Sequence, residues 1–167
     1  ARTEQWDEII RHCHGPIKNY LYLTYLNRAL AEKGELADRM FAFDQHGPQG
    51  LLASWNKTFT VSTLLSDAYF TLGEIALSQE MAFEGYVTVI GAGNPRNLQR
   101  LVQTNLIYGT YPIAEKYISI LEKTYAYHDW AKRHRGFLYN DKAIEADPVL
   151  GPKRKALPKE SNLSGIN

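Results

Sequence analysis

The chain has 167 residues, a length that favours one domain with a single sizeable core. Hydrophobic residues make up 44% and charged residues 22%, which argues against a disordered, collagen-like or membrane-spanning chain. The net charge of +1 gives no global field that would favour nucleic acid, and the single cysteine, Cys13, excludes an intrachain disulfide.

The N-terminal segment, residues 4–13, has the pattern of the second helix of a hairpin, with Trp6 in an aromatic position. It lacks a charged start followed by an apolar core, so it is not a signal peptide. Gly15 and Pro16 then break the chain, and Pro16 is suited to begin the next helix. We therefore expect a piece of a longer chain whose upstream part is missing.

Three later segments align on a glycine, at Gly34, Gly73 and Gly109. Apolar residues recur at three- and four-residue steps before each glycine, which predicts an amphipathic helix that the glycine ends. A second helix follows at once, so each segment predicts an antiparallel helical hairpin. The residues eight positions before the glycines are leucines, and those five positions before are small: Leu26, Leu65 and Leu101, then Ala29, Ala68 and Thr104.

The pattern predicts one helical-repeat domain over residues 1–158, with a polar tail over 159–167. The hairpins are expected at about 16–44, 58–90 and 95–124, a loop at 44–58, and a further helix at 125–138. The segment Gly91-Ala92-Gly93 could cradle a phosphate, but no strand precedes it. We interpret it as a connector before a helix that Asn94 caps and Pro95 opens.

The hairpins resemble the tetratricopeptide repeat family. The best local match is GTYPIAEKYISILEKT, residues 109–124, in which Ala114 stands at the small position where neighbouring helices cross. The resemblance implies an all-α superhelix of antiparallel hairpins with a concave binding surface. Residues that depart from the family's pattern are Leu23, Ser62 and Leu98, which replace a tryptophan, and Arg39, which replaces a small residue.

Two longer runs, YLNRALAEKGELADRMF and QTNLIYGTYPIAEKYISILEK, are similar to the soluble C-terminal part of a family of uncharacterised membrane proteins from Bacteroidetes. The resemblance covers most of the chain and brings no catalytic motif with it. It implies a membrane anchor upstream of residue 1. It also implies that this soluble domain is extracytoplasmic.

No residue cluster carries a recognisable chemistry. His12, Cys13 and His14 are possible zinc ligands, but on a helix the two histidines lie about 200° apart, so we interpret the cluster as a helix end. The basic excess over residues 132–159 is interpreted as a solvated surface, with contact to phosphates as the alternative. No metalloprotease, thiol-redox or serine-nucleophile motif occurs. The sequence therefore predicts no cofactor, metal site or catalytic residue, and favours a non-enzymatic role.

The best candidate for a binding surface is the concave face, where the first helix of each hairpin presents a polar row. We expect this row to bind an unknown protein or peptide. Arg28, Asp67 and Gln103 should be at least partly exposed, whereas the leucine row beside them should be buried. An ordinary solvated face is one alternative. A helical enzyme or small-ligand domain is another, which convergent acidic and histidine side chains in one deep pocket would reveal. The polar row consists of Arg28, Asp67 and Gln103, with Thr24, Thr63 and Gln99 four residues before them.

Overall fold

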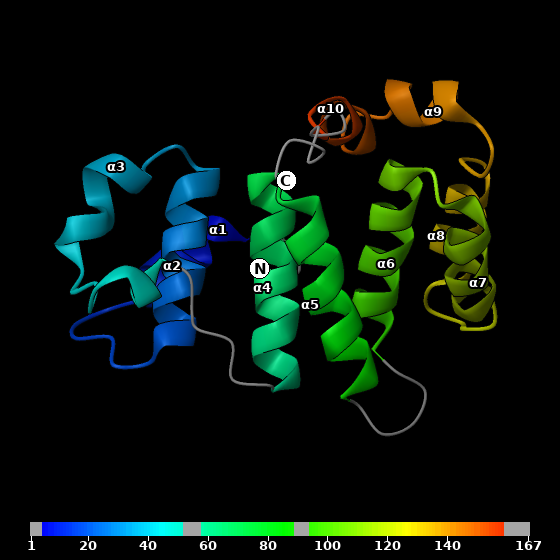
Figure 1. Ribbon diagram of the computed structural model, residues 1–167. Coiled ribbons are helices and arrows are strands. Elements are labelled where there is room, and N and C mark those ends of the chain that lie inside the picture. Colours follow the sequence, from blue (N-terminus) through cyan, green and yellow to red (C-terminus); the bar gives the residue numbers. More distant parts are fainter. Residues whose placement is uncertain (1–4, 52–57, 89–93, 159–167) are drawn as a thin grey trace, which may run out of the picture.

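The computed structural model describes residues 5–51, 58–88 and 94–158, and all regular secondary structure within these ranges is helical (Figure 1). The all-α class predicted from the sequence is confirmed. In chain order the helices are α1 (Trp6–His12), α2 (Tyr20–Glu32), α3 (Leu36–Arg39), α4 (Phe59–Leu72), α5 (Ile75–Val87), α6 (Pro95–Tyr108), α7 (Tyr111–Glu122), α8 (His128–Arg135), α9 (Asp141–Ala146) and α10 (Leu150–Lys155). Short 3₁₀ turns span Met40–Ala42 and Pro48–Gly50.

The three aligned glycines lie where the sequence places them, between consecutive antiparallel helices. Gly34, Gly73 and Gly109 have φ values of 71°, 88° and 73°, in the left-handed region that ends a helix cheaply only for glycine. The glycines separate α2 from α3, α4 from α5, and α6 from α7. Hairpins at all three positions are therefore observed, although the first one is incomplete.

The second arm of the first hairpin is much shorter than the pattern predicts. Helix α3 ends at Arg39, and the chain continues through 3₁₀ turns back toward α2. The amide of Asn27 on α2 donates to the side-chain oxygen of Gln45 at 2.6 Å and to the carbonyl oxygen of Gly50 at 2.9 Å. These bonds fix residues 45–50 against α2, so this part of the predicted loop is ordered by tertiary contacts. Residues 52–57 of that loop lie outside the described residues.

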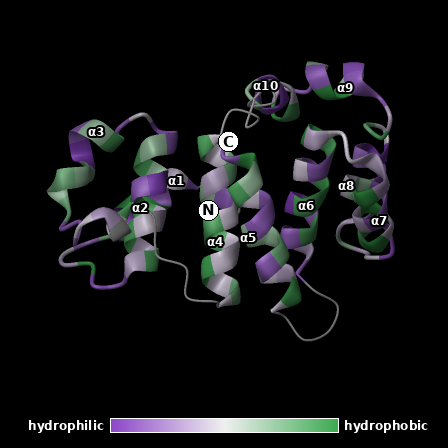
Figure 2. Ribbon diagram, in the orientation of Figure 1, coloured by the Kyte–Doolittle hydropathy of each residue, from purple (hydrophilic) through white to green (hydrophobic). Residues whose placement is uncertain are grey.

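The helices bury amphipathic faces against one another. Hydrophobic and hydrophilic residues alternate along the ribbons of α4 to α7 (Figure 2). The predicted leucine row is buried, since Leu26, Leu65 and Leu101 are at most 2% exposed. A large core cluster joins α4 to α10, whereas α2 has a smaller cluster of its own that Ile10 and Leu36 cover. The N-terminal helices therefore contact the rest mainly through the side of α2 that faces α4.

The remaining expectations about elements have mixed outcomes. Asn94 caps α6, because its side-chain oxygen accepts a hydrogen bond from the backbone N–H of Arg96 at 2.7 Å. Helix α8 is shorter than the predicted 125–138 segment. The Gly91-Ala92-Gly93 connector and the tail at 159–167 fall outside the described residues. Among the helices that are described, none has the length and apolar character needed to cross a membrane.

Candidate functional site

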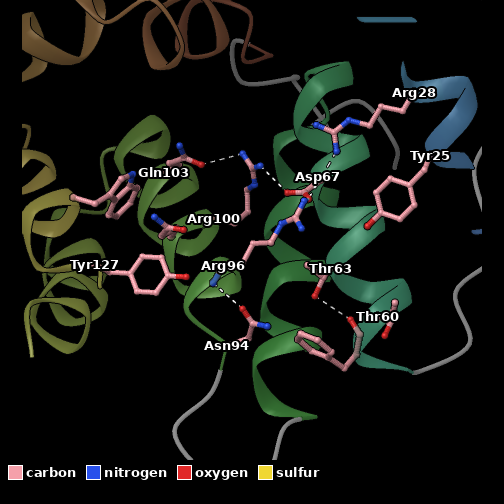
Figure 3. Close-up of a pocket in the computed structure, with 13 residues that line it drawn as sticks. Tyr25, Arg28, Thr60, Thr63, Asp67, Asn94, Arg96, Arg100, Gln103 and Tyr127 are labelled. Carbon is pink, nitrogen blue, oxygen red and sulfur yellow. Dashed lines mark hydrogen bonds and ion pairs between the residues drawn. The ribbon is translucent and has the colours of Figure 1, made fainter. Parts of the chain in front are cut away.

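A polar cavity of about 580 Å³ opens between α2, α4 and α6, beside the start of α8 (Figure 3). Five of the six predicted concave-face residues line it. They are Arg28, Thr63, Asp67, Gln99 and Gln103. The other lining residues are Tyr25, Phe59, Thr60, Asn94, Arg96, Arg100, Tyr127 and Trp130. The first helices of the three hairpins therefore bring the polar row to one cavity.

The sixth residue, Thr24, does not line the cavity. Its side chain is buried, and its hydroxyl donates to the carbonyl oxygen of Tyr20 one turn earlier, at 2.8 Å. Thr63 is also buried and donates in the same way to the carbonyl oxygen of Phe59 at 2.9 Å, although it does contact the cavity. Both hydroxyls are therefore engaged within their own helices, and a role of these threonines in binding stays a prediction.

Asp67 is the centre of the site, and its predicted exposure is wrong. The residue is only 4% exposed, because arginine side chains from α2 and α6 cover its carboxylate. Its Oδ1 accepts a hydrogen bond from Nη2 of Arg100 at 2.8 Å, and its Oδ2 accepts one from Nη2 of Arg96. Nη1 of Arg28 lies 3.8 Å from the same Oδ2. Three guanidinium groups thus converge on one buried carboxylate.

The two arginines of α6 are the residues that sequence reasoning missed. The cap at Asn94 fixes the first turn of α6, and Arg96 and Arg100 then follow one turn apart on the side that faces α4. Arg100 is held further by Gln103, whose side-chain oxygen accepts from its Nη1 at 2.9 Å. Both arginines lie on the same face of α6 as Gln103, seven and three residues before it. The helical spacing in the sequence could therefore have placed them beside the predicted polar row.

Arg28 reaches the site from α2 and is positioned by groups on both helices. Its Nη2 donates to the hydroxyl of Thr71 on α4 at 3.3 Å, and its Nε lies 3.7 Å from a carboxylate oxygen of Glu32. Its guanidinium carbon lies 5.6 Å from the ring centre of Trp6. Arg28 therefore links the N-terminal helices to α4 at the edge of the cavity.

The cavity is electropositive. The described residues that line it include three arginines and one aspartate, a net charge of +2, although the whole chain carries only +1. Just outside the lining, the carboxylate of Glu32 beside Arg28 is balanced by the ammonium of Lys153, which shares the ring of Phe70 with Arg100, so the local charge stays +2. Burial lowers the pKa of Arg100, with smaller contributions from Arg28 and Arg96, while Asp67 opposes the shift. Arginine nevertheless stays charged in proteins. Burial also raises the pKa of Tyr25, which keeps that phenol neutral.

The arginine cluster has more donors than acceptors. Nε and Nη1 of Arg28 and Nε of Arg100 are buried and form no hydrogen bond with the described residues, although the two Arg28 atoms lie 3.7 and 3.8 Å from carboxylate oxygens of Glu32 and Asp67. Buried donors of this kind are rare in folded proteins. A cluster with excess positive charge and excess N–H donors is suited to an anion that accepts several hydrogen bonds.

The same geometry offers little for acid–base catalysis. Among the described residues that line the cavity, none is a histidine, cysteine, lysine or glutamate. The single carboxylate, Asp67, already accepts hydrogen bonds from two arginines. A general base must be able to take a proton within hydrogen-bond reach of a substrate, and this carboxylate is turned toward cations instead.

A second, apolar cavity of about 840 Å³ lies between α1 and α2 and includes the cluster at His12, Cys13 and His14. Helix α1 ends at His12, so the cluster does lie at a helix end. Burial raises the pKa of the Cys13 thiol, which is the reverse of what activates a nucleophilic cysteine. In the described part of the chain no group of three or more histidine, cysteine or acidic residues is placed to hold a metal ion.

Comparison with known proteins gives a family but no activity. The chain belongs to a family of unknown function (DUF6057), whose model matches residues 1–166. No curated protein and no solved structure matches the chain. The function must therefore be argued from the geometry of the site.

Proposed function

We propose that this domain is a non-enzymatic recognition module whose concave face binds a protein or peptide partner through an anionic group. The observation that carries the proposal is the convergence of Arg28, Arg96 and Arg100 on one carboxylate, which leaves a net charge of +2 in a cavity open to solvent. Arginine forks are the usual protein ligands for carboxylate and phosphate groups, and they give a partner both orientation and affinity.

The polar row supports a partner that extends beyond one anionic group. Gln99 and Gln103 lie on α6 beside the arginines, and Thr60 lies on α4 across the cavity. Amides and hydroxyls at these positions provide hydrogen bonds without adding charge. The site thus combines a charged centre with neutral polar surroundings, an arrangement suited to binding rather than to chemistry.

The experiment is a titration of the ¹⁵N-labelled protein with an aspartate- and glutamate-rich peptide and with its asparagine and glutamine counterpart. We expect the acidic peptide alone to shift amide resonances of α4 and α6, with an affinity that falls as salt rises. The variant Arg96→Gln should weaken this binding. Arg135→Gln is the matched control, because Arg135 lies on α8 and pairs with Glu122 away from the cavity. Equal binding of the two peptides, or no effect of Arg96→Gln, would contradict the proposal.

A second candidate is the binding of a small anionic molecule. The cavity of about 580 Å³ lies in the size range of small-molecule sites, and aromatic residues stand at its edge. A peptide partner should contact residues well beyond the cavity, whereas a small ligand should shift only the resonances of the lining residues. The same titration therefore separates the two candidates.

We further propose that the three hairpins belong to a tetratricopeptide-like superhelix, and that the domain is the extracytoplasmic part of a membrane-anchored chain. The left-handed glycines and the buried leucine row support the first point. The second rests on the resemblance to membrane proteins from Bacteroidetes. Fractionation of cells that express the full-length protein tests it, since recovery from the soluble cytoplasmic fraction would contradict an anchor.

A further inference from the structure

We propose that the anionic group taken by the cavity is a phosphomonoester carried on a flat, apolar group such as an aromatic ring. This inference rests on the proposed function, and it names the chemical class of the ligand. It is drawn from the charge of the site, from the directions of its donors and from the opposite wall of the cavity.

The charge of the site favours a dianion. The lining residues carry +2 after Asp67 is counted against the three arginines. A phosphomonoester carries about −1.5 to −2 at pH 7, whereas a carboxylate, a sulfate ester or a phosphodiester carries one negative charge. Because the guanidinium of Arg100 is largely withdrawn from water, charge left uncompensated there is costly. A dianion matches the net charge of the site.

The donors favour a tetrahedral group over a planar one. Arg96 and Arg100 already direct one Nη2 each at the planar carboxylate of Asp67, so a ligand carboxylate competes for donors that are in use and should bind more weakly than a tetrahedral anion. The third guanidinium, that of Arg28, comes from a different helix and approaches Oδ2 of Asp67. Three oxygens in a tetrahedral group can accept hydrogen bonds from several directions at once, whereas a carboxylate pairs best with a single fork.

The opposite wall of the cavity favours a ring. Tyr127 and Trp130 line it from the start of α8, and the ring of Tyr127 points toward the first turn of α6 (Figure 3). The indole of Trp130 is held by a stacked His134, with ring centres 3.5 Å apart and planes at 18°. His134 is itself fixed, because its Nδ1–H donates to the carbonyl oxygen of Trp130 at 2.9 Å. A held aromatic wall beside a cationic centre suits a ligand with a flat body and an anionic end.

Four small probes test the inference by isothermal titration calorimetry: phenyl phosphate, phenyl sulfate, benzoate and methyl phosphate. Phenyl phosphate should bind about tenfold or more tighter than phenyl sulfate and benzoate, the equivalent of one further charge-assisted hydrogen bond. It should also bind more tightly than methyl phosphate, because methyl phosphate has no ring to place against the aromatic wall. The comparison with phenyl sulfate isolates charge, since both groups are tetrahedral.

Variants assign the effect to the cavity. Arg96→Gln should lower the affinity for phenyl phosphate about tenfold, and its side chain is one-third exposed, so the variant should fold. Trp130→Ala should weaken the binding of phenyl phosphate and leave that of methyl phosphate unchanged. Arg135→Gln, on the same helix as Trp130, should change neither. Circular dichroism of each variant shows whether the helices remain folded.

The outcomes separate this inference from the proposed function. If benzoate and phenyl sulfate bind as tightly as phenyl phosphate and depend on Arg96, the phosphomonoester is wrong and anion recognition stands. If none of the four anions nor the acidic peptide binds, both are wrong. Comparison of free phosphotyrosine with a peptide that contains it then identifies the source of the group. A tighter complex with the peptide assigns a phosphorylated partner, and equal affinity assigns a small phosphorylated molecule.

Discussion

Replacement of Asp67 by asparagine tests whether the arginine cluster is organised by its central carboxylate. The substitution keeps the shape of the side chain and removes one buried negative charge. It also turns one acceptor into an N–H₂ donor, which then faces an arginine N–H. Both carboxylate oxygens accept hydrogen bonds from arginines in the native protein, so either orientation of the new amide leaves one guanidinium without its acceptor.

The magnitude follows from the burial of the pairs. Removal of one partner from a buried ion pair costs about 3–5 kcal/mol of unfolding free energy. The side chains of Asp67 and Arg100 are 5% and 15% exposed, but that of Arg96 is 32% exposed and can recover hydration. We therefore expect the lower end, about 3 kcal/mol. For a domain of this size that loss corresponds to a fall in Tm of roughly 6–12 °C.

The assay is urea unfolding followed by circular dichroism at 222 nm, with Tm measured in parallel. Glu80→Gln, which removes an exposed carboxylate on α5, is the control and should change stability by less than about 0.5 kcal/mol. Phosphate should raise the Tm of Asp67→Asn more than that of the native protein, since the variant has one more uncompensated charge. A loss below about 1 kcal/mol would refute the reasoning, because it would show that the arginines do not depend on Asp67.

Three further predictions concern packing, backbone and charge. Gly85→Ala should lower the free energy of unfolding in urea by about 1–3 kcal/mol, because the new Cβ would lie 2.4 Å from Nδ2 of Asn97. The double variant with Asn97→Ala should recover part of this loss. Gly73→Ala should lower the free energy of unfolding by about 1–2 kcal/mol because of its φ of 88° alone, since a Cβ there meets nothing within 4 Å. A smaller loss in urea unfolding would contradict the left-handed helix end. Arg135 lowers the pKa of Glu122, chiefly through a hydrogen bond, so this pair stabilises the fold above the pKa of an unfolded glutamate and loses that effect as pH falls through the lowered value. Arg135→Gln should therefore raise the pKa of Glu122 in an NMR titration, and an unchanged pKa would contradict the pairing.

The parts of the fold that were predictable from sequence are those set by local physics. Glycine adopts the left-handed conformation at low cost, so Gly34, Gly73 and Gly109, each at the end of an amphipathic run, could be expected to end helices. The leucine row was likewise predictable, because the helix period alone decides which residues share the apolar face. Leu26 and Leu101 are buried for this reason.

The first hairpin shows where local reasoning ends. Its glycine and leucine positions match those of the other two, yet α3 is only four residues long. In place of a longer second helix, Asn27 donates hydrogen bonds to Gln45 and Gly50, which lie 18 and 23 residues away in the sequence. Contacts at that distance in sequence depend on the tertiary structure, and the repeat register carries no information about them.

For the candidate site too, the part set by local sequence was predictable and the part set by tertiary contacts was not. Alignment of the three hairpins predicted where the cavity lies, because equivalent positions on the first helix of each hairpin face the same side. Arg28, Asp67 and Gln103 occupy these positions and all line the cavity. The alignment did not predict the charge of the cavity, because a comparison of equivalent positions cannot show which side chains of different helices contact each other. Arg96 and Arg100 share a helix face with Gln103 and meet Asp67 from the next first helix along the chain.

That pairing decides both the burial of the acid and the sign of the cavity. A carboxylate without these partners would stay hydrated and would make the surface around it negative. Covered by three guanidinium groups, Asp67 is buried and the cavity carries +2. The net charge of the chain, +1, contains no trace of this local field, because acidic residues elsewhere balance it. The charge of the cavity therefore follows from how the helices pack, and the composition of the chain does not predict it.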